Sequence, residues 1–209
     1  MIFYDCSYAP SPRRARMAIA EKGLHAETRE VDLSAKEQFS DDFLMLNPRA
    51  TVPVLVADDG TVLTENVAIA HFLDAISPEV PLMGGSASEK GLVSMWNAIN
   101  EHYGLFALSE TVRNASPGLK GRAITGPLKV EQISALAERG RLRTLHYFDM
   151  IESHLQANCF FAGANFSFAD ITALVALDFA KVVDLAVPAT HTATLEWWDK
   201  VAARESASA

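Results

Sequence analysis

A serine between two prolines is the first place in this chain where chemistry can occur. The segment SYAPSPRRARMAIAEKG (7–23) follows a short apolar run, and its pattern predicts a helix over residues 13–22 that ends at Gly23. Pro12 can occupy the first turn of a helix without losing a hydrogen bond. Because a helix N-terminus and a hydroxyl group both stabilise an anion, Ser11 is the favoured residue to hold one here.

Other reactive groups surround this serine. Tyr8 is the second hydroxyl candidate, whereas Cys6 ends the apolar run and is expected to be a buried structural residue rather than a nucleophile. Arg13, Arg14 and Arg16 either add positive potential at the helix start or are simply solvated. The segment therefore predicts a site for an anion, with two hydroxyl groups as alternative donors.

Composition and motifs exclude several classes of protein. A net charge of -8 argues against a nucleic-acid partner. There is no phosphate-binding loop, no dinucleotide fingerprint and no spacing of His and Cys that indicates a metal. No export signal and no membrane-spanning run are visible, and two distant cysteines suit a reducing compartment. We expect a cytoplasmic protein without a metal and without a membrane segment.

The first 76 residues alternate between strand and helix patterns. The first two strands need a crossover helix and should be parallel, whereas Asp59-Gly60 is a strong hairpin signal that makes the last two antiparallel. A four-stranded mixed sheet with helices on its faces is the result. The expected elements are strands at 2–5 and 27–32, a helix at 35–46, two strands within 52–66 and a helix at 67–76.

The remainder of the chain is predicted to be helical. Residues 77–87 are rich in proline, glycine and serine and indicate a linker between domains 1–76 and 88–209. Ser167 and Asp170 form a capping box that starts a core helix and carries no chemistry. The fold class is thus α/β followed by all-α. The expected helices span roughly 88–114, 129–157, 168–184 and 191–204.

Three segments give the chain a family likeness that extends over nearly its whole length. They are LNPRATVPVL (46–55), TENVAIAHFL (64–73) and the capping box at 167–170. Together they resemble the cytosolic glutathione S-transferases, with features of the bacterial, zeta, omega and theta types. The resemblance implies a thioredoxin-like glutathione-binding domain, an all-helical C-terminal domain, glutathione as co-substrate and a homodimer.

The resemblance also implies which residues bind glutathione. The Val52–Pro53 bond is expected to be cis, which leaves the N–H and C=O of Val52 free to pair with the extended tripeptide. Glu65 would bind the γ-glutamyl ammonium group and the N–H of Asn66 its carboxylate, although serine is usual at the second position. Lys36 either contacts the glycine carboxylate of the peptide or is an ordinary surface lysine.

One departure from the family concerns the catalytic position itself. Aligning RRAR (13–16) with the arginine-rich first turn of the relatives places Ala9 where they carry a catalytic serine or cysteine. Alanine donates no hydrogen bond, and without a cysteine the mixed-disulfide chemistry of the omega type is disfavoured. Ser11 is therefore the favoured support for the glutathione thiolate, with Tyr8 as the alternative.

The leading functional prediction is transfer of the glutathione thiolate to small hydrophobic electrophiles. The electrophile would bind between the domains, where Tyr103 and Phe106 either line the pocket or belong to the core. A non-catalytic glutathione-binding protein is one alternative, and Ala9 is the feature that favours it. A glutathione-dependent isomerase or lyase is another.

Overall fold

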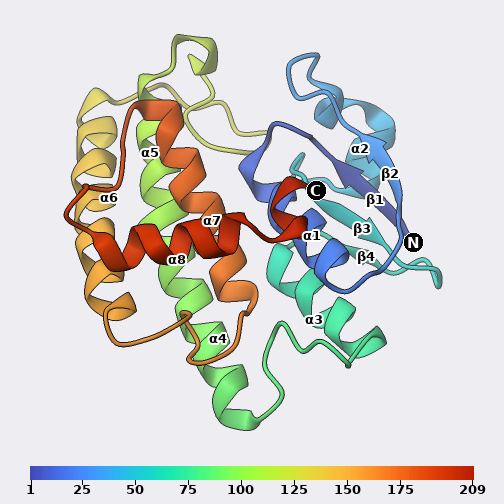
Figure 1. Cartoon of the computed structure of the whole chain (residues 1–209). Helices are drawn as coiled ribbons and strands as arrows, with labels where there is room; N and C mark the ends of the chain where they lie inside the picture. The colour runs from blue at the N-terminus through green and yellow to red at the C-terminus, as the bar shows by residue number, and fades with distance from the viewer.

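The computed structural model describes residues 1–209 and contains a mixed sheet beside a helical domain (Figure 1). The parallel pairing of β1 with β2 and the antiparallel hairpin of β3 with β4 are as predicted. The structure adds the strand order β2-β1-β3-β4 and the antiparallel pairing of β3 with β1. All four residues of β2 are exposed, which identifies it as an edge strand. The strands are β1 (Ile2–Asp5), β2 (Glu27–Glu30), β3 (Val54–Val56) and β4 (Val62–Leu63).

Three helices accompany the sheet: α1 (Pro10–Glu21), α2 (Asp41–Leu46) and α3 (Asn66–Ile76). The predicted start of α1 at residue 13 is wrong, because the extended residue Ala9 already caps the helix and Pro10 fits its first position. The helix predicted over 35–46 is in fact a 3-10 turn, Glu37–Phe39, followed by α2.

The second domain contains five α-helices: α4 (Ala87–Ile99), α5 (Phe106–Ala115), α6 (Ser134–Leu155), α7 (Phe168–Ala180) and α8 (Thr192–Ala202). A π-helical segment, Asn100–Leu105, joins α4 to α5, so that the expected long helix exists but contains a wide turn. The start predicted for α6 at residue 129 is wrong. Val130 instead pairs with Arg122 in an isolated bridge that closes the loop before the helix. No helix combines the length and hydropathy that crossing a bilayer requires.

Helix α7 forms the centre of the hydrophobic core, and its N-terminus carries the predicted capping box. Asp170 accepts hydrogen bonds from the backbone N–H and hydroxyl of Ser167 at 3.0 and 2.9 Å, from the N–H of Phe161 at 3.1 Å and from the indole of Trp197 at 2.9 Å. Burial raises the pKa of Asp170 to about 6. With every contact directed to the core, Asp170 has the structural role that was predicted for it.

The C-terminus of the chain returns to the first domain and lies against α1 (Figure 1). Arg204 makes a bidentate contact with Glu21 of α1, at 2.8 and 2.6 Å, and Ser206 donates to the same carboxylate at 2.5 Å. Helix α1 also packs against α7. The last residues of the chain and the core helix therefore both fix the position of α1.

Helices α5 and α6 approach each other closely at Gly140. A Cβ atom at this position would lie 2.5 Å from the carbonyl oxygen of Ala107 and 2.6 Å from Oγ1 of Thr111. Since backbone cannot move away as a flexible side chain can, we expect Gly140→Ala to lower the free energy of unfolding by about 1–3 kcal/mol. Chemical denaturation measures this change.

Gly91 in the exposed face of α4 provides the matched control. A Cβ atom there meets nothing within 4 Å. Gly91→Ala should therefore raise stability by up to about 1 kcal/mol through helix propensity alone. Equal effects of the two substitutions would show that the α5–α6 contact does not require glycine.

Candidate active site

The sheet register brings three predicted segments to one edge of the sheet. Tyr4 of β1 lies opposite Val54 of β3, and continuing this antiparallel register places Val52 level with Cys6, where the chain leaves β1 for α1. The hairpin β3–β4 then leads back to α3 and to Asn66 at the same edge. The chain segments before α1, β3 and α3 thus converge.

At the start of α1, one residue carries the unpaired backbone N–H. The N–H of Ala9 is bonded to the carbonyl oxygen of Cys6 at 2.9 Å, and Pro10 and Pro12 have no N–H. Among the first three helical residues, only Ser11 therefore has a backbone N–H, and this group has no acceptor. Ser11 is half-buried, and it offers this N–H and its hydroxyl group to a ligand.

The structure joins Ser11 directly to Asn66. Nδ2 of Asn66 donates a hydrogen bond to Oγ of Ser11 at 3.0 Å, although 55 residues separate them. Asn66 is the first residue of α3, and the backbone N–H groups of Asn66 and Val67 have no acceptors. Because the N-terminus of a helix attracts negative charge, these free groups can bind a carboxylate.

The Val52–Pro53 peptide bond is cis, as predicted. Asn47 is buried, and its Nδ2 donates to the carbonyl oxygen and the hydroxyl group of Thr51 at 2.8 and 3.0 Å, which fixes the chain just before this bond. Neither the N–H nor the C=O of Val52 has a hydrogen-bond partner. These two groups are available for an extended peptide to pair with.

Two charged residues predicted for the site lie on its exposed rim. Glu65 is exposed and forms an ion pair with Arg49 at 2.9 Å, while Arg49 also contacts the hydroxyl of Thr64. Lys36 is exposed, has a left-handed backbone with φ of 65°, and makes no ion pair or hydrogen bond with the other predicted residues. Glu65 is therefore oriented by a partner, whereas Lys36 is a free cation.

Tyr8 extends into solvent, with 65% of its surface exposed. Desolvation, followed by the neighbouring Cys6 thiol, raises the pKa of Tyr8, so that its phenol keeps its proton at neutral pH. Cys6 is fully buried, which confirms its predicted structural place. Of the two hydroxyl candidates, only Ser11 lies on the helix start itself.

The three arginines after Ser11 are neither solvated nor free, and this part of the prediction is wrong. Arg13 pairs with Asp178 at 2.7 Å and Arg16 with Asp5 at 2.7 Å. Arg14 is buried and pairs with Glu101 at 2.5 Å. Their positive charges are compensated by acidic partners, so the donors of the helix start, rather than free arginines, are available to an anion.

Glu101 is the partner of Arg14 that sequence reasoning missed. It lies in the π-helical segment of the other domain, 87 residues beyond Arg14. Desolvation lowers the pKa of Arg14, whereas the charges of Glu101 and of Glu65 raise it. No local motif marks such a pair, because its two members meet only when the domains are docked.

The π-helical segment is held in place by a buried asparagine. Asn100 donates to the carbonyl oxygen of Ala169 at 3.0 Å and accepts from the hydroxyl of Tyr147 at 3.1 Å. The same segment presents Tyr103 at its surface, and Phe106 follows at the start of α5. π-Helical turns are frequent at functional sites.

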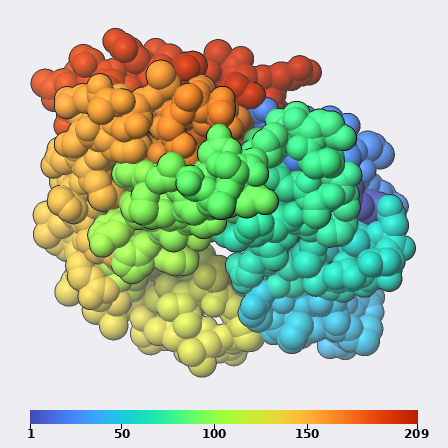
Figure 2. Space-filling view, turned by 90° about the horizontal axis from the view of Figure 1, so that it is seen from below, coloured from blue at the N-terminus to red at the C-terminus, as the bar shows by residue number.

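Tyr103 and Phe106 lie at the surface, with exposed fractions of 39% and 60%, so the alternative that they belong to the core is wrong. The ring of His102 meets both edge-on, at 5.0 Å from Tyr103 and 6.5 Å from Phe106. Figure 2 shows a hollow between the green helices of the second domain and the teal part of the first. The aromatic side chains belong to the segment on the green side of this hollow.

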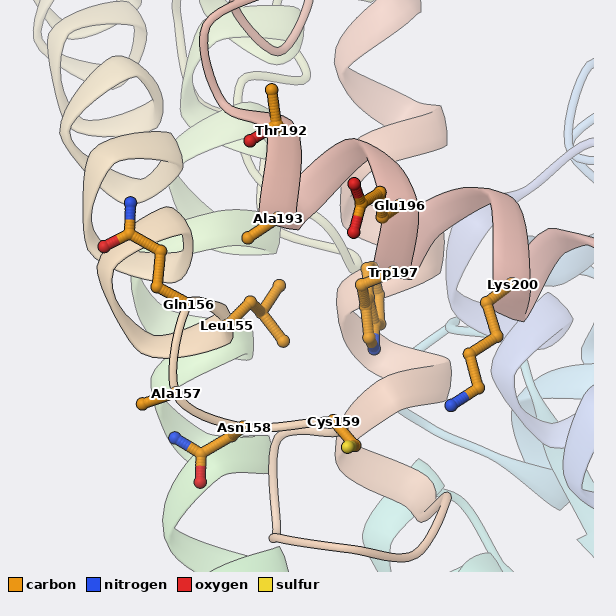
Figure 3. A pocket seen from close by; sticks show the side chains of 10 residues that line it. All are labelled: Leu155, Gln156, Ala157, Asn158, Cys159, Thr192, Ala193, Glu196, Trp197 and Lys200. Atoms are coloured by element: carbon orange, nitrogen blue, oxygen red, sulfur yellow. The ribbon is translucent and has the colours of Figure 1, made fainter.

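A separate cavity of about 530 Å³ lies at the end of α6, beside α8 (Figure 3). Cys159, Glu196 and Lys200 are among its lining residues, and none of the predicted site residues is. The indole of Trp197, which also lines it, is bonded to Asp170 of the core. This cavity is therefore distinct from the converging loops at the sheet edge.

Comparison with protein families decides the identity of the fold. Residues 6–76 match the model of the glutathione S-transferase N-terminal domain, and residues 106–205 match that of the C-terminal domain. The chain belongs to the glutathione S-transferase family. The predicted fold class, a thioredoxin-like domain followed by a helical domain, is confirmed, and the chain is an enzyme of this family.

Individual relatives agree along the whole chain. Glutathione S-transferase 2 of Saccharomyces cerevisiae is 35% identical over 99% of this chain and 87% of its own. The crystal structure of Gtt2 from the same yeast has a TM-score of 0.89 at 34% identity and covers 99% of this chain and 98% of that one. A glutathione S-transferase domain-containing protein of Marinobacter aquaeolei has a TM-score of 0.90 at 33% identity, covering 99% of both chains.

The buried pair between Arg14 and Glu101 generates a stability prediction. Removing one partner leaves the other charge without compensation, so Glu101→Ala should lower the free energy of unfolding by about 3–5 kcal/mol. The exposed pair between Arg29 and Glu27 is the control, since its side chains are 47% and 62% exposed. Glu27→Ala should cost less than about 1 kcal/mol. Similar losses in denaturation would contradict a special role for the buried pair.

Proposed function

We propose that this glutathione S-transferase adds the glutathione thiolate to small hydrophobic electrophiles. The observation that carries the proposal is the row of unpaired backbone donors and acceptors at one sheet edge. Ser11, Val52 and Asn66 each have a backbone N–H without a partner. The hydrogen bond from Asn66 to the hydroxyl of Ser11 brings two of these residues into direct contact.

Each part of the tripeptide has a complementary group in this row. The γ-glutamyl carboxylate binds the N–H groups of Asn66 and Val67 at the start of α3, and the ammonium group binds Glu65. The cysteinyl backbone pairs with the N–H and C=O of Val52 as an added strand would. Lys36 is the cation for the glycine carboxylate.

The thiol then faces the start of α1. A free thiol has a pKa of about 8.5, so only a small fraction is ionised at neutral pH. The N–H and hydroxyl groups of Ser11 both donate to the sulfur and favour its anionic form. The thiol proton passes to solvent, and the sulfur then forms a bond to an electrophilic carbon, whose leaving group or π electrons take up the displaced electron pair.

The electrophile binds on the side of the second domain. Tyr103 and Phe106 supply exposed aromatic surface there, and the ring of His102 lies edge-on to both. Aromatic walls favour flat or apolar molecules without selecting one functional group. The same site can also serve an isomerase or lyase, in which the sulfur adds and is later released.

The non-catalytic alternative rested on Ala9, which has no hydroxyl or thiol group at the usual catalytic position. The unpaired N–H and the hydroxyl of Ser11, two residues later, support the catalytic alternative instead, because both can donate to a thiolate. We further propose a homodimer that acts in the cytoplasm. Val62, Ile76, Leu92 and Met95, on β4, α3 and α4, are exposed apolar side chains that a partner subunit would cover.

Removing the Ser11 hydroxyl tests the proposed chemistry. In Ser11→Ala, the thiol pKa of bound glutathione should rise by about one unit toward the free value, since one of two donors is lost. The ultraviolet absorbance of the thiolate, followed across pH, measures this pKa. Turnover of an aryl halide at pH 6.5 should fall roughly tenfold and recover at high pH.

Tyr8→Phe is the matched control and should change the thiol pKa less than Ser11→Ala does. A larger shift in Tyr8→Phe would exchange the roles of the two hydroxyl groups. If neither substitution shifts the pKa, the hydroxyl groups have no part in stabilising the thiolate.

Glu65→Ala tests the binding of the γ-glutamyl ammonium group. Loss of a charged hydrogen bond should weaken glutathione binding by about 1–3 kcal/mol in calorimetry. Glu79→Ala removes an exposed carboxylate from the linker and should leave the affinity unchanged. An unaltered affinity in folded Glu65→Ala would reject this assignment.

A further inference from the structure

Asn66 carries a buried amide that local structure does not explain. Only 3% of the residue is exposed, and Oδ1 has no hydrogen-bond partner. The side chain does not cap α3, because the capping residue is Glu65 and no side chain accepts from the free N–H groups there. Its one hydrogen bond goes to the hydroxyl of Ser11 on another helix. Since a buried polar group without all its partners is costly, this arrangement calls for a role outside α3.

The direction of the hydrogen bond determines what Ser11 can do. Nδ2 of Asn66 donates at 3.0 Å, so Oγ of Ser11 is the acceptor. A hydroxyl group has one hydrogen and two lone pairs. With a lone pair occupied by Asn66, the hydrogen of Ser11 must point away from the amide.

The direction of this bond follows from the position of the amide in the structure. Nδ2 faces Oγ of Ser11, while Oδ1 points to the side where it has no partner. Asn66 is therefore the donor of this pair.

We propose that Asn66 is a positioning residue that directs the hydroxyl hydrogen of Ser11 toward the glutathione sulfur. The inference rests on the proposed function, in which Ser11 donates to that sulfur. The chain length of asparagine is essential, because the amide nitrogen lies one bond farther from Cβ than a serine hydroxyl does. Serine, usual in the family at this position, is too short to make the same contact from the same backbone.

This assignment gives Asn66 two separate tasks at one helix start. Its backbone N–H faces the γ-glutamyl carboxylate, whereas its side chain acts on the thiol through Ser11. Changes of the side chain should therefore move the ionisation of the thiol more than the affinity for glutathione. A residue that only supports the fold would not separate these two measurements.

Asn66→Asp is the sharpest variant, because it reverses the hydrogen bond without removing it. A carboxylate only accepts, so it would take the hydrogen of Ser11 and bring a negative charge near the thiolate. Aspartate is favoured in the first turn of a helix, but its carboxylate would be buried here, so thermal unfolding of this variant is measured before its thiol pKa. The thiol pKa of bound glutathione should rise by more than one unit in Asn66→Asp and by about one unit in Asn66→Ala.

The experiment uses the full chain saturated with glutathione, with thiolate absorbance followed across pH and affinity measured by calorimetry. Thermal unfolding reports whether each variant folds, and Asn66→Ser replaces Asn66→Ala if that variant does not. In a Ser11→Ala background, Asn66→Ala should cause no further shift in the thiol pKa. This loss of effect is the signature of a residue that acts through Ser11.

Three results would overturn the inference. A full shift from Asn66→Ala in the Ser11→Ala background would mean that Asn66 acts independently of Ser11. A shift in Ser11→Ala, with none in Asn66→Ala or Asn66→Asp, would reject the positioning role and leave the proposed function intact. No shift in Ser11→Ala itself would reject the role of Ser11, and the role of Asn66 with it.

Discussion

The side chain of Arg14 extends from α1 to Glu101 of the second domain. Its Nη1 lies 2.5 Å from Oε1 of Glu101, and the contact is mostly buried. Bringing this guanidinium group out of water is unfavourable, and only a close carboxylate offsets the cost. If the domains packed without this contact, the positive charge of Arg14 would be buried without a partner. We therefore interpret the pair as a main contact between α1 and the second domain, although Nε of Arg14 remains buried without a partner.

The position of α1 determines the rest of the site. Arg13 contacts α7, Arg204 returns from the C-terminus to Glu21, and Arg14 reaches the π-helical segment. These contacts lie along the body of the helix and leave its N-terminus free. The unpaired groups of Ser11, Val52 and Asn66 remain at the edge of the sheet, where a ligand can satisfy them. Paired charges along the body of α1 thus coexist with unpaired backbone groups at its N-terminus.

Much of this arrangement was predictable because its signals are local. The Asp59-Gly60 hairpin and the capping box at Ser167 each depend on a few neighbouring residues, whereas the cis bond before Pro53 was expected from the family resemblance. The partners of the arginines were not predictable, since Arg14 and Glu101 are 87 residues apart and acidic residues are common throughout the chain. The start of α1 was predicted three residues too late, because prolines usually interrupt a helical pattern. Here Pro10 occupies the first position of the helix.

Pro10 and Pro12 explain why an alanine at position 9 matters for the helix start. A serine or threonine at the N-cap usually accepts a hydrogen bond from the N–H of the second or third helical residue. Here the third residue, Pro12, has no N–H, so the N–H of Ser11 would be the only group left for a capping side chain to take. Ala9 cannot take it, and the donor stays open to a ligand. The absence of a hydroxyl at position 9 and the presence of one at Ser11 are therefore parts of a single arrangement, which leaves the N–H of Ser11 unpaired at the helix start.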